Sequence, residues 1–174
     1  WIAEAFTKKG LEAPRLQSEM LVAHILGCDR LRLYMEADRP ASPLELQTLR
    51  GLVARALKDE PIDYLVGERW FFGIPFHVSS AVLVPRPCTE AIVEQVLLQV
   101  RARGAAGGGG AAAKSGEGIR IADVCTGSGC IAISILKNLP AATAIATDIS
   151  TDALAIAMRN ACLLYTSDAA DEGL

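Results

Sequence analysis

The sequence predicts an α/β protein in which a bundle of helices precedes a β-hairpin and then alternating strands and helices. Three observations predict this order. Apolar residues recur at helical spacing over residues 1–60, and aromatic and β-branched residues gather over residues 61–84. Residues 119–161 then contain two strand-like and two helix-like segments around a glycine-rich turn. We expect the two strands to be parallel, because a helix connects them.

Composition narrows the class of protein. The chain has 174 residues, of which 51% are hydrophobic, so it can form one domain with a sizeable core or two small ones. A formal net charge of −3 gives no general attraction to nucleic acid or to an anionic membrane. The chain has five cysteines and no Cys-x-x-Cys pair, which predicts neither a disulfide framework nor a zinc site. A reducing cytoplasm is the expected setting, and no metal is expected.

Two apolar stripes predict the main helices of residues 1–60. The first stripe consists of Leu16, Met20, Val22, Ala23 and Leu26, with Gly27 as its stop. The second begins at a predicted capping box, in which Ser42 caps the helix, Pro43 takes its first position and Glu45 follows. It continues through Leu46, Leu49, Val53 and Leu57. These stripes suit a small helical bundle.

The aromatic-rich region that follows predicts a β-hairpin. We place its strands at Trp70–Phe72 and Phe76–Val78, followed by an extended segment at Val82–Val84. Thr89 is expected to cap a helix over Glu90–Arg101.

A low-complexity stretch at residues 104–118 is rich in glycine and alanine, and we expect it to be a linker without a core. An α/β pattern follows. We place strands at Ile119–Val124 and Thr143–Thr147, and helices at about Cys130–Asn138 and Thr151–Ala161.

The glycine-rich turn lies at the carboxyl end of the first strand, where open α/β sheets bind ligands. Gly127 and Gly129 allow unusual backbone angles and close approach of a ligand. The second strand ends at Asp148, about 20 residues further on, the spacing at which an acid accepts hydrogen bonds from ribose hydroxyls. Each residue also has a purely structural alternative: the glycines as a plain turn, and Asp148, with Ser150, as a helix cap.

Two ligands suit this pattern, a dinucleotide and S-adenosylmethionine. A dinucleotide fingerprint needs three glycines, but the positions here are Cys125, Gly127 and Cys130. Asp123, at the end of the first strand, repels a diphosphate and suits a ligand with an amino group and a sulfonium cation, although it also has a structural alternative as a turn acid. The charges therefore favour S-adenosylmethionine.

Several motifs together resemble a known family. They are Tyr64 to Gly67, Phe72-Gly73, Pro85 to Glu90, Asp123 to Ala132, and Asp148 to Ser150 followed by Ala153-Leu154. In this combination they resemble the methyltransferases that modify a glutamine of peptide chain release factors. The resemblance implies an N-terminal domain of about five helices that docks the release factor, a β-hairpin bridge, and the start of a Rossmann-like class I S-adenosylmethionine-dependent methyltransferase domain.

The resemblance also implies an activity and a site. S-adenosylmethionine would donate a methyl group to the side-chain amide nitrogen of a glutamine, with the release factor as protein partner and no membrane or nucleic-acid partner. The implied donor-binding residues are Asp123, Cys125, Thr126, Gly127, Ser128, Gly129, Asp148 and Ile149. Residues 126–129 would line the methionine part and Asp148 would hold the ribose. Arg86, Thr89 and Glu90 would lie near the donor pocket.

The chain departs from the family pattern at three places. Cys125 replaces the first glycine of the turn, and Cys88 replaces an acid. The Asn-Pro-Pro-Tyr segment that orients the acceptor amide in the family does not occur in the printed sequence, so we assign no catalytic residue and expect the chain as printed to be inactive.

The chain is expected to divide into six segments. Residues 1–60 form the helical docking domain, 61–84 the β-hairpin bridge and 85–103 a helix that leads into the catalytic domain. Residues 104–118 form the linker, 119–161 the partial methyltransferase domain and 162–174 a non-native tail. Two other functions stay open. One is a non-catalytic module that binds a release factor, and the other is a related methyltransferase that acts on nucleic acid.

Overall fold

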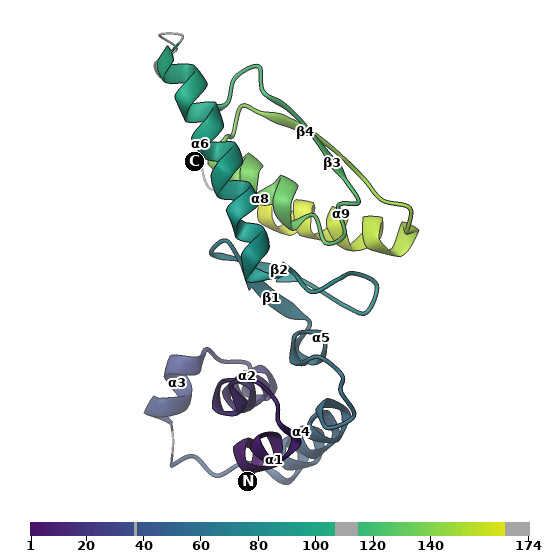
Figure 1. Ribbon diagram of the computed structural model, residues 1–174. Coiled ribbons are helices and arrows are strands. Elements are labelled where there is room, and N and C mark those ends of the chain that lie inside the picture. Colours follow the sequence, from purple (N-terminus) through teal and green to yellow (C-terminus); the bar gives the residue numbers. More distant parts are fainter. Residues whose placement is uncertain (37, 107–114, 166–174) are drawn as a thin grey trace, which may run out of the picture. The chain divides into compact units, whose positions relative to one another are not determined.

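The computed structural model describes residues 1–36, 38–106 and 115–165, and it divides the chain into two compact units, Trp1–Gly67 and Glu68–Leu174 (Figure 1). The fold is α/β, as the sequence predicts, because the first unit is helical and the second combines helices with two small sheets. No helix in the described ranges is long and apolar enough to cross a membrane.

Five helices make up the described part of the first unit. They are α1 (Ile2–Lys9), α2 (Pro14–Leu26), α3 (Arg30–Met35), α4 (Pro43–Ala56) and α5 (Ile62–Val66). Their shared core consists of Ile2, Phe6, Leu21, Leu49, Val53, Ala56, Ile62 and Leu65. Four of the five helices contribute to this core, which explains why short helices are stable here.

The predicted ends of the two main helices are confirmed. Gly27 ends α2 in the left-handed conformation, with φ of 61°. The Ser42 hydroxyl accepts a hydrogen bond from the Glu45 N–H at 3.2 Å, and the Glu45 carboxylate accepts one from the Ser42 N–H at 2.7 Å, so the capping box forms.

The predicted stripe on α2 is wrong in one respect. Leu16 is 39% exposed while Leu21 is fully buried, because residues five apart lie about 140° apart around a helix.

The second unit begins with the hairpin, which pairs β1 (Glu68–Phe71) antiparallel with β2 (Ile74–His77). The hairpin is confirmed, but each strand begins two residues and ends one residue earlier than predicted. The turn is formed by Phe72 and Gly73, with φ of 51° and 74°, so Phe72 belongs to the turn and not to a strand. The segment predicted as extended, Val82–Val84, is a bend and irregular backbone, not a strand.

A 3-10 turn (η1, Pro87–Thr89) leads into α6 (Glu90–Ala106). Thr89 lies inside this turn, where its N–H donates to the Arg86 carbonyl. Helix α6 continues five residues past its predicted end, into the segment predicted as a linker. The middle of that segment, residues 107–114, lies outside the described residues. Its end is structured, since Gly116 is buried against Leu139 and Ala142, which corrects the expectation that it has no part in a core.

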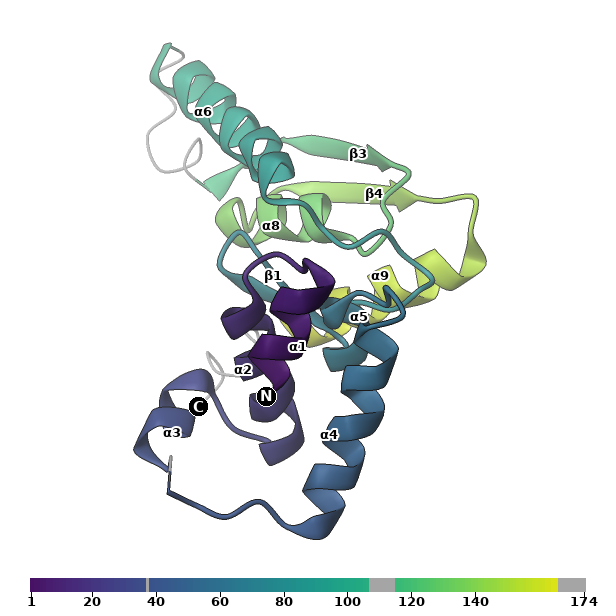
Figure 2. The same ribbon diagram turned by 60° about the horizontal axis from the view of Figure 1, so that its bottom comes forward.

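Strands β3 (Arg120–Val124) and β4 (Thr143–Thr147) pair in parallel, which confirms the prediction (Figure 2). Helix α8 (Cys130–Asn138) connects them and contacts both strands. The last helix, α9 (Thr151–Tyr165), contacts α8 and β2. It continues past its predicted end at residue 161, so residues 162–165 of the predicted tail are helical, and residues 166–174 lie outside the described residues.

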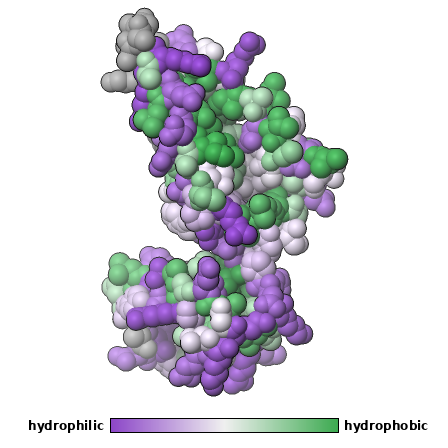
Figure 3. All heavy atoms as spheres, viewed as in Figure 1, coloured by the Kyte–Doolittle hydropathy of each residue, from purple (hydrophilic) through white to green (hydrophobic). Residues whose placement is uncertain are grey.

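The core of the second unit joins the hairpin to α6 and α8. Its buried members are Phe71, Phe76, Val93, Leu97, Val100, Cys130, Ile133, Ile135, Leu139 and Ala142. The rings of Phe71 and Phe76 meet edge to face, with centroids 6.1 Å apart. On the β3–β4 sheet, in contrast, Val124 and Ile145 are 73% and 72% exposed, and hydrophobic side chains are visible on this unit's surface (Figure 3).

Candidate functional site

The turn between β3 and α8, residues Cys125–Gly129, has an unusual backbone. Cys125, Gly127 and Gly129 all have positive φ, of 63°, 55° and 79°. Glycine adopts this region at no steric cost, whereas a cysteine there is strained. A Cβ on Gly129 would lie 3.0 Å from the Ile133 side chain, so a larger residue at this position would crowd the first turns of α8.

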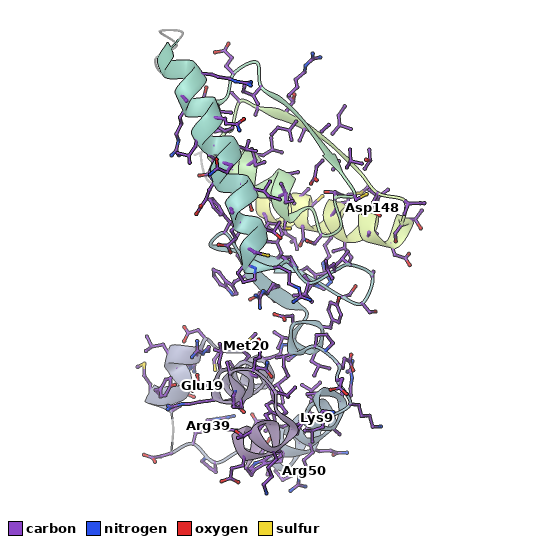
Figure 4. The ribbon with its side chains drawn as sticks, viewed as in Figure 1. Lys9, Glu19, Met20, Arg39, Arg50 and Asp148 are labelled. Atoms are coloured by element: carbon purple, nitrogen blue, oxygen red, sulfur yellow. The ribbon has the colours of Figure 1, made fainter. Side chains whose placement is uncertain are left out.

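Asp148 joins this turn to the end of β4, where Figure 4 labels it. One carboxylate oxygen accepts a hydrogen bond from the Gly127 N–H at 2.9 Å, and the other accepts one from the Ser150 N–H at 3.0 Å. The Thr126 N–H donates to the Thr147 carbonyl at 2.9 Å and extends the strand pairing into the turn. The backbone N–H groups of Ser150 and Gly127 hold the pKa of Asp148 below its usual range.

The structural alternative, in which Asp148 and Ser150 cap the last helix, is confirmed for Ser150 only. The Ser150 hydroxyl takes that part, accepting a hydrogen bond from the Ala153 N–H at 3.1 Å. Asp148 instead bridges two segments that are adjacent only because β3 and β4 are parallel.

Asp123 is a buried residue near the end of β3, just before the turn. A single carboxylate oxygen of Asp123 accepts two hydrogen bonds, from the Thr126 hydroxyl at 2.7 Å and from the Ala132 N–H at 3.3 Å. The acid therefore has a structural part in closing the turn onto α8, whatever else it binds. Ser128 is also buried, while Cys125 and Ile149 are exposed, Ile149 fully so.

Sequence reasoning missed Asn160, a buried residue of α9 that is 1% exposed. Its amide oxygen accepts a hydrogen bond from the His77 N–H at 2.8 Å. Its amide nitrogen donates to the carbonyls of His77, at 3.0 Å, and Ser128, at 2.8 Å. The available signal was one polar residue on the helical stripe that contains Ala153 and Ala157, both buried.

Glu90, the first residue of α6, contacts the hairpin turn. Its carboxylate accepts a hydrogen bond from the Phe72 N–H at 2.9 Å, which satisfies a backbone group in a strained conformation. Thr89 is half-buried, and Arg86 and Cys88 are exposed. The structure therefore brings Asp123, residues 125–129 and Asp148 together, and it links Glu90 to the hairpin.

Fold and site together define an α/β protein with a glycine-rich, acid-closed turn at the carboxyl ends of two parallel strands, the place where proteins of this class bind ligands. Comparison with known proteins is more specific. Residues 1–67 match the family model described as the PrmC N-terminal domain.

Several relatives that the chain matches are named release factor glutamine methyltransferase. The protein from Chlorobaculum tepidum is 40% identical over 156 residues, which are 90% of this chain and 50% of that protein. The proteins from Geobacter sulfurreducens and Rhodopirellula baltica are 41% and 39% identical, over 92% and 97% of this chain and 51% and 54% of theirs. Residues 1–67 thus match the PrmC N-terminal domain family model, and the chain is similar over most of its length to proteins named release factor glutamine methyltransferase, which confirms the resemblance. The chain spans about half the length of the curated relatives it matches.

Proposed function

We propose that residues 119–161 form the start of a Rossmann-like class I methyltransferase domain and contribute the donor-binding half of its site. S-adenosylmethionine is the proposed donor, and it supplies a methyl group on a sulfonium cation. The observation that carries the proposal is the Asp148 carboxylate held against the Gly127 N–H at the ends of two parallel strands. The names of the relatives support the reaction class.

The residues of the turn suit this ligand. The Asp148 carboxylate, kept ionised by two backbone N–H groups, has lone pairs left for the ribose hydroxyls. Residues 126–129 line the path of the methionine part, and Asp123 gives the turn the negative charge that favours an ammonium and a sulfonium. Ile149, exposed directly after the acid, offers an apolar side chain to the adenine ring. Arg86, Thr89 and Glu90 are proposed to lie near this pocket.

The proposed acceptor is a glutamine of a peptide chain release factor, by the name of the relatives. An amide nitrogen is a poor nucleophile because its lone pair is delocalised, so the acceptor has to be oriented toward the methyl group. The Asn-Pro-Pro-Tyr segment does not occur in the printed sequence, so we expect this chain by itself to bind the donor and transfer no methyl group. Residues 1–67 are proposed to dock the release factor in the cytoplasm.

Titration calorimetry of the whole chain with S-adenosylmethionine tests the donor site. We expect binding, and we expect Asp148→Ala to weaken it at least about tenfold, since hydrogen bonds to a charged group contribute about 1.5–3 kcal/mol. Asp152→Ala is the matched control, because Asp152 is an exposed acid in the first turn of α9 and should leave the affinity unchanged. Tight binding of a dinucleotide without binding of S-adenosylmethionine would overturn the proposal.

A second function, a binding module without catalysis, is favoured by one observation. Helices α2, α3 and α4 surround a pocket of about 180 Å³. Its lining includes the apolar residues Val22, Ile25, Leu46 and Leu49, and Arg39 and Glu45 are among its charged residues. Binding of a purified release factor to the chain, combined with no detectable donor binding, would establish this function instead.

A further inference from the structure

We propose that Asn160 is a positioning residue, which holds the glycine-rich turn in its donor-binding shape by tying it to the β-hairpin. The inference rests on the donor half of the proposed function. It starts from the buried amide of Asn160, which contacts two segments far from it in sequence, the strand β2 at His77 and the turn at Ser128.

The amide of Asn160 is fully used. An asparagine side chain has two N–H donors and one oxygen acceptor, and here both kinds of group are engaged with backbone. The oxygen accepts from the His77 N–H, and the nitrogen donates to the carbonyls of His77 and Ser128. An acid at this position would turn an oxygen toward two carbonyls, and an aliphatic residue would leave these three backbone groups without their partner, the Ser128 carbonyl in a buried position.

The contact with Ser128 completes a set of bonds that hold consecutive peptide groups of the turn. The Thr126 N–H is held by Thr147, the Gly127 N–H by Asp148 and the Gly129 N–H by the Thr126 carbonyl, all at 2.9 Å. The Ser128 carbonyl is held by Asn160 at 2.8 Å. Because glycine has a wide choice of backbone angles, a turn with two glycines keeps one shape only if such bonds specify it.

The hairpin is a firm anchor for this contact. Phe71 and Phe76 of its two strands are buried in the core of the second unit. Its turn is held by Glu90 through the Phe72 N–H, at the opposite end of the strands from His77, which pairs with Glu68. The hairpin is thus fixed at both ends, by α6 and by α9, and Asn160 transmits that fixed position to the turn.

The test compares Asn160→Asp with Asn138→Asp in the whole chain. Asn138 is a matched control, since its side-chain nitrogen also donates to a carbonyl, that of Ser134 within α8, but does not contact the turn. Amide hydrogen exchange of Gly127 and Gly129 is measured without ligand, and donor affinity is measured by calorimetry. We expect Asn160→Asp to speed exchange at both glycines and to weaken S-adenosylmethionine binding, each about tenfold, and Asn138→Asp to change neither.

The two readouts separate the failures. Unchanged exchange at Gly127 and Gly129 in Asn160→Asp would overturn the positioning role, whether or not the donor binds. Faster exchange with unchanged donor affinity would overturn it as well, while leaving the donor site intact. If the unmodified chain binds no S-adenosylmethionine, the proposed function falls, and the exchange data alone decide whether Asn160 holds the turn. Should Asn160→Asp fail to fold, Asn160→Ser, which keeps a small polar side chain, takes its place in the same comparison.

Discussion

The carboxylate of Asp148 and the backbone N–H of Gly127 lie 2.9 Å apart, oxygen to nitrogen, although 21 residues separate them in the chain. The contact joins the end of β4 to the turn that follows β3, and it exists because the two strands are parallel and end at the same edge. A ligand that replaced or shared this hydrogen bond would contact both strands at once.

This relationship predicts an acid-sensitive contribution of Asp148 to stability. Its pKa lies below the ordinary value of 3.8, so it stabilises the fold at pH values above that figure and loses the effect as the pH falls through its lowered pKa. We expect Asp148→Asn to lower the urea midpoint of unfolding at pH 7 and to differ much less from the unmodified chain near the acid limit. Asp152→Asn is the control. An equal difference at neutral and acid pH would contradict the prediction.

Cys125 predicts a stabilising substitution. Its φ of 63° costs an L-residue about 1–2 kcal/mol, whereas glycine adopts this angle freely but loses about 0.5–1 kcal/mol through the entropy of the unfolded chain. We therefore expect Cys125→Gly to raise the free energy of unfolding by up to about 1.5 kcal/mol and Cys125→Val to lower it by about 1 kcal/mol or more. Denaturant unfolding measures both.

The matched control for Cys125 is Cys88, which is exposed in a 3-10 turn and does not have positive φ. There Cys88→Gly should destabilise. If glycine destabilises at both positions alike, the left-handed strain assigned to Cys125 is absent.

Substitutions at Gly116 and Gly118 distinguish the cost of steric crowding from the cost of backbone strain. Both have positive φ, of 82° and 74°. A Cβ on Gly116 would lie 2.7 Å from the Cβ of Leu139, while one on Gly118 would meet nothing within 4 Å. We expect Gly118→Ala to cost about 1 kcal/mol and Gly116→Ala to cost a further 1–3 kcal/mol or so, measured as the free energy of unfolding. Equal losses would show that residues 116 and 139 are not in contact.

In the first unit, we expect Glu19 to make a second acid-sensitive contribution to the stability of the fold. Its carboxylate accepts hydrogen bonds from the Tyr34 hydroxyl and the Arg30 guanidinium, both at 2.6 Å, and these lower its pKa from 4.5 to about 2. Because its pKa is lowered in the folded state, ionised Glu19 stabilises the fold at pH values above 4.5. This stabilisation is lost as the pH falls from 4.5 toward 2.

We expect Glu19→Gln to cost about 1–2 kcal/mol at pH 7 and to flatten the loss of stability across that acid interval. Thermal unfolding from pH 7 to pH 2 measures this effect. Glu12→Gln, at an exposed position, is the control and should retain the steep acid loss of the unmodified chain. A Glu19→Gln curve with the same steepness would show that Glu19 is not the group responsible.

Local sequence patterns predicted much of the fold. Helix α8 and strand β4 have the predicted bounds, and the capping box of α4 forms as expected. These features depend on residues within a few positions of one another, so propensity and periodicity are sufficient. The hairpin strands were predicted to begin two residues and to end one residue too late, because aromatic residues favour strands and Phe72 gives no sign of its left-handed backbone.

The candidate site divides in the same way. Asp123, Asp148 and the glycines stand at spacings that motif reasoning recognises, and their assignment to a donor stays a prediction. The hydrogen bonds from the Phe72 N–H to Glu90 and from the His77 N–H to Asn160 span 18 and 83 residues, and no local pattern indicates them.

The sequence by itself determined the order of helices and strands, the parallel pairing, the glycine-rich turn with its acid, and the relationship to the methyltransferase family. Only the tertiary structure decided that α9 holds the turn through Asn160, that Gly116 packs against Leu139, and that Cys125 adopts a glycine conformation. The physical reason is that propensities and spacings act between neighbours along the chain. A buried polar group is instead satisfied by whatever backbone the fold brings beside it.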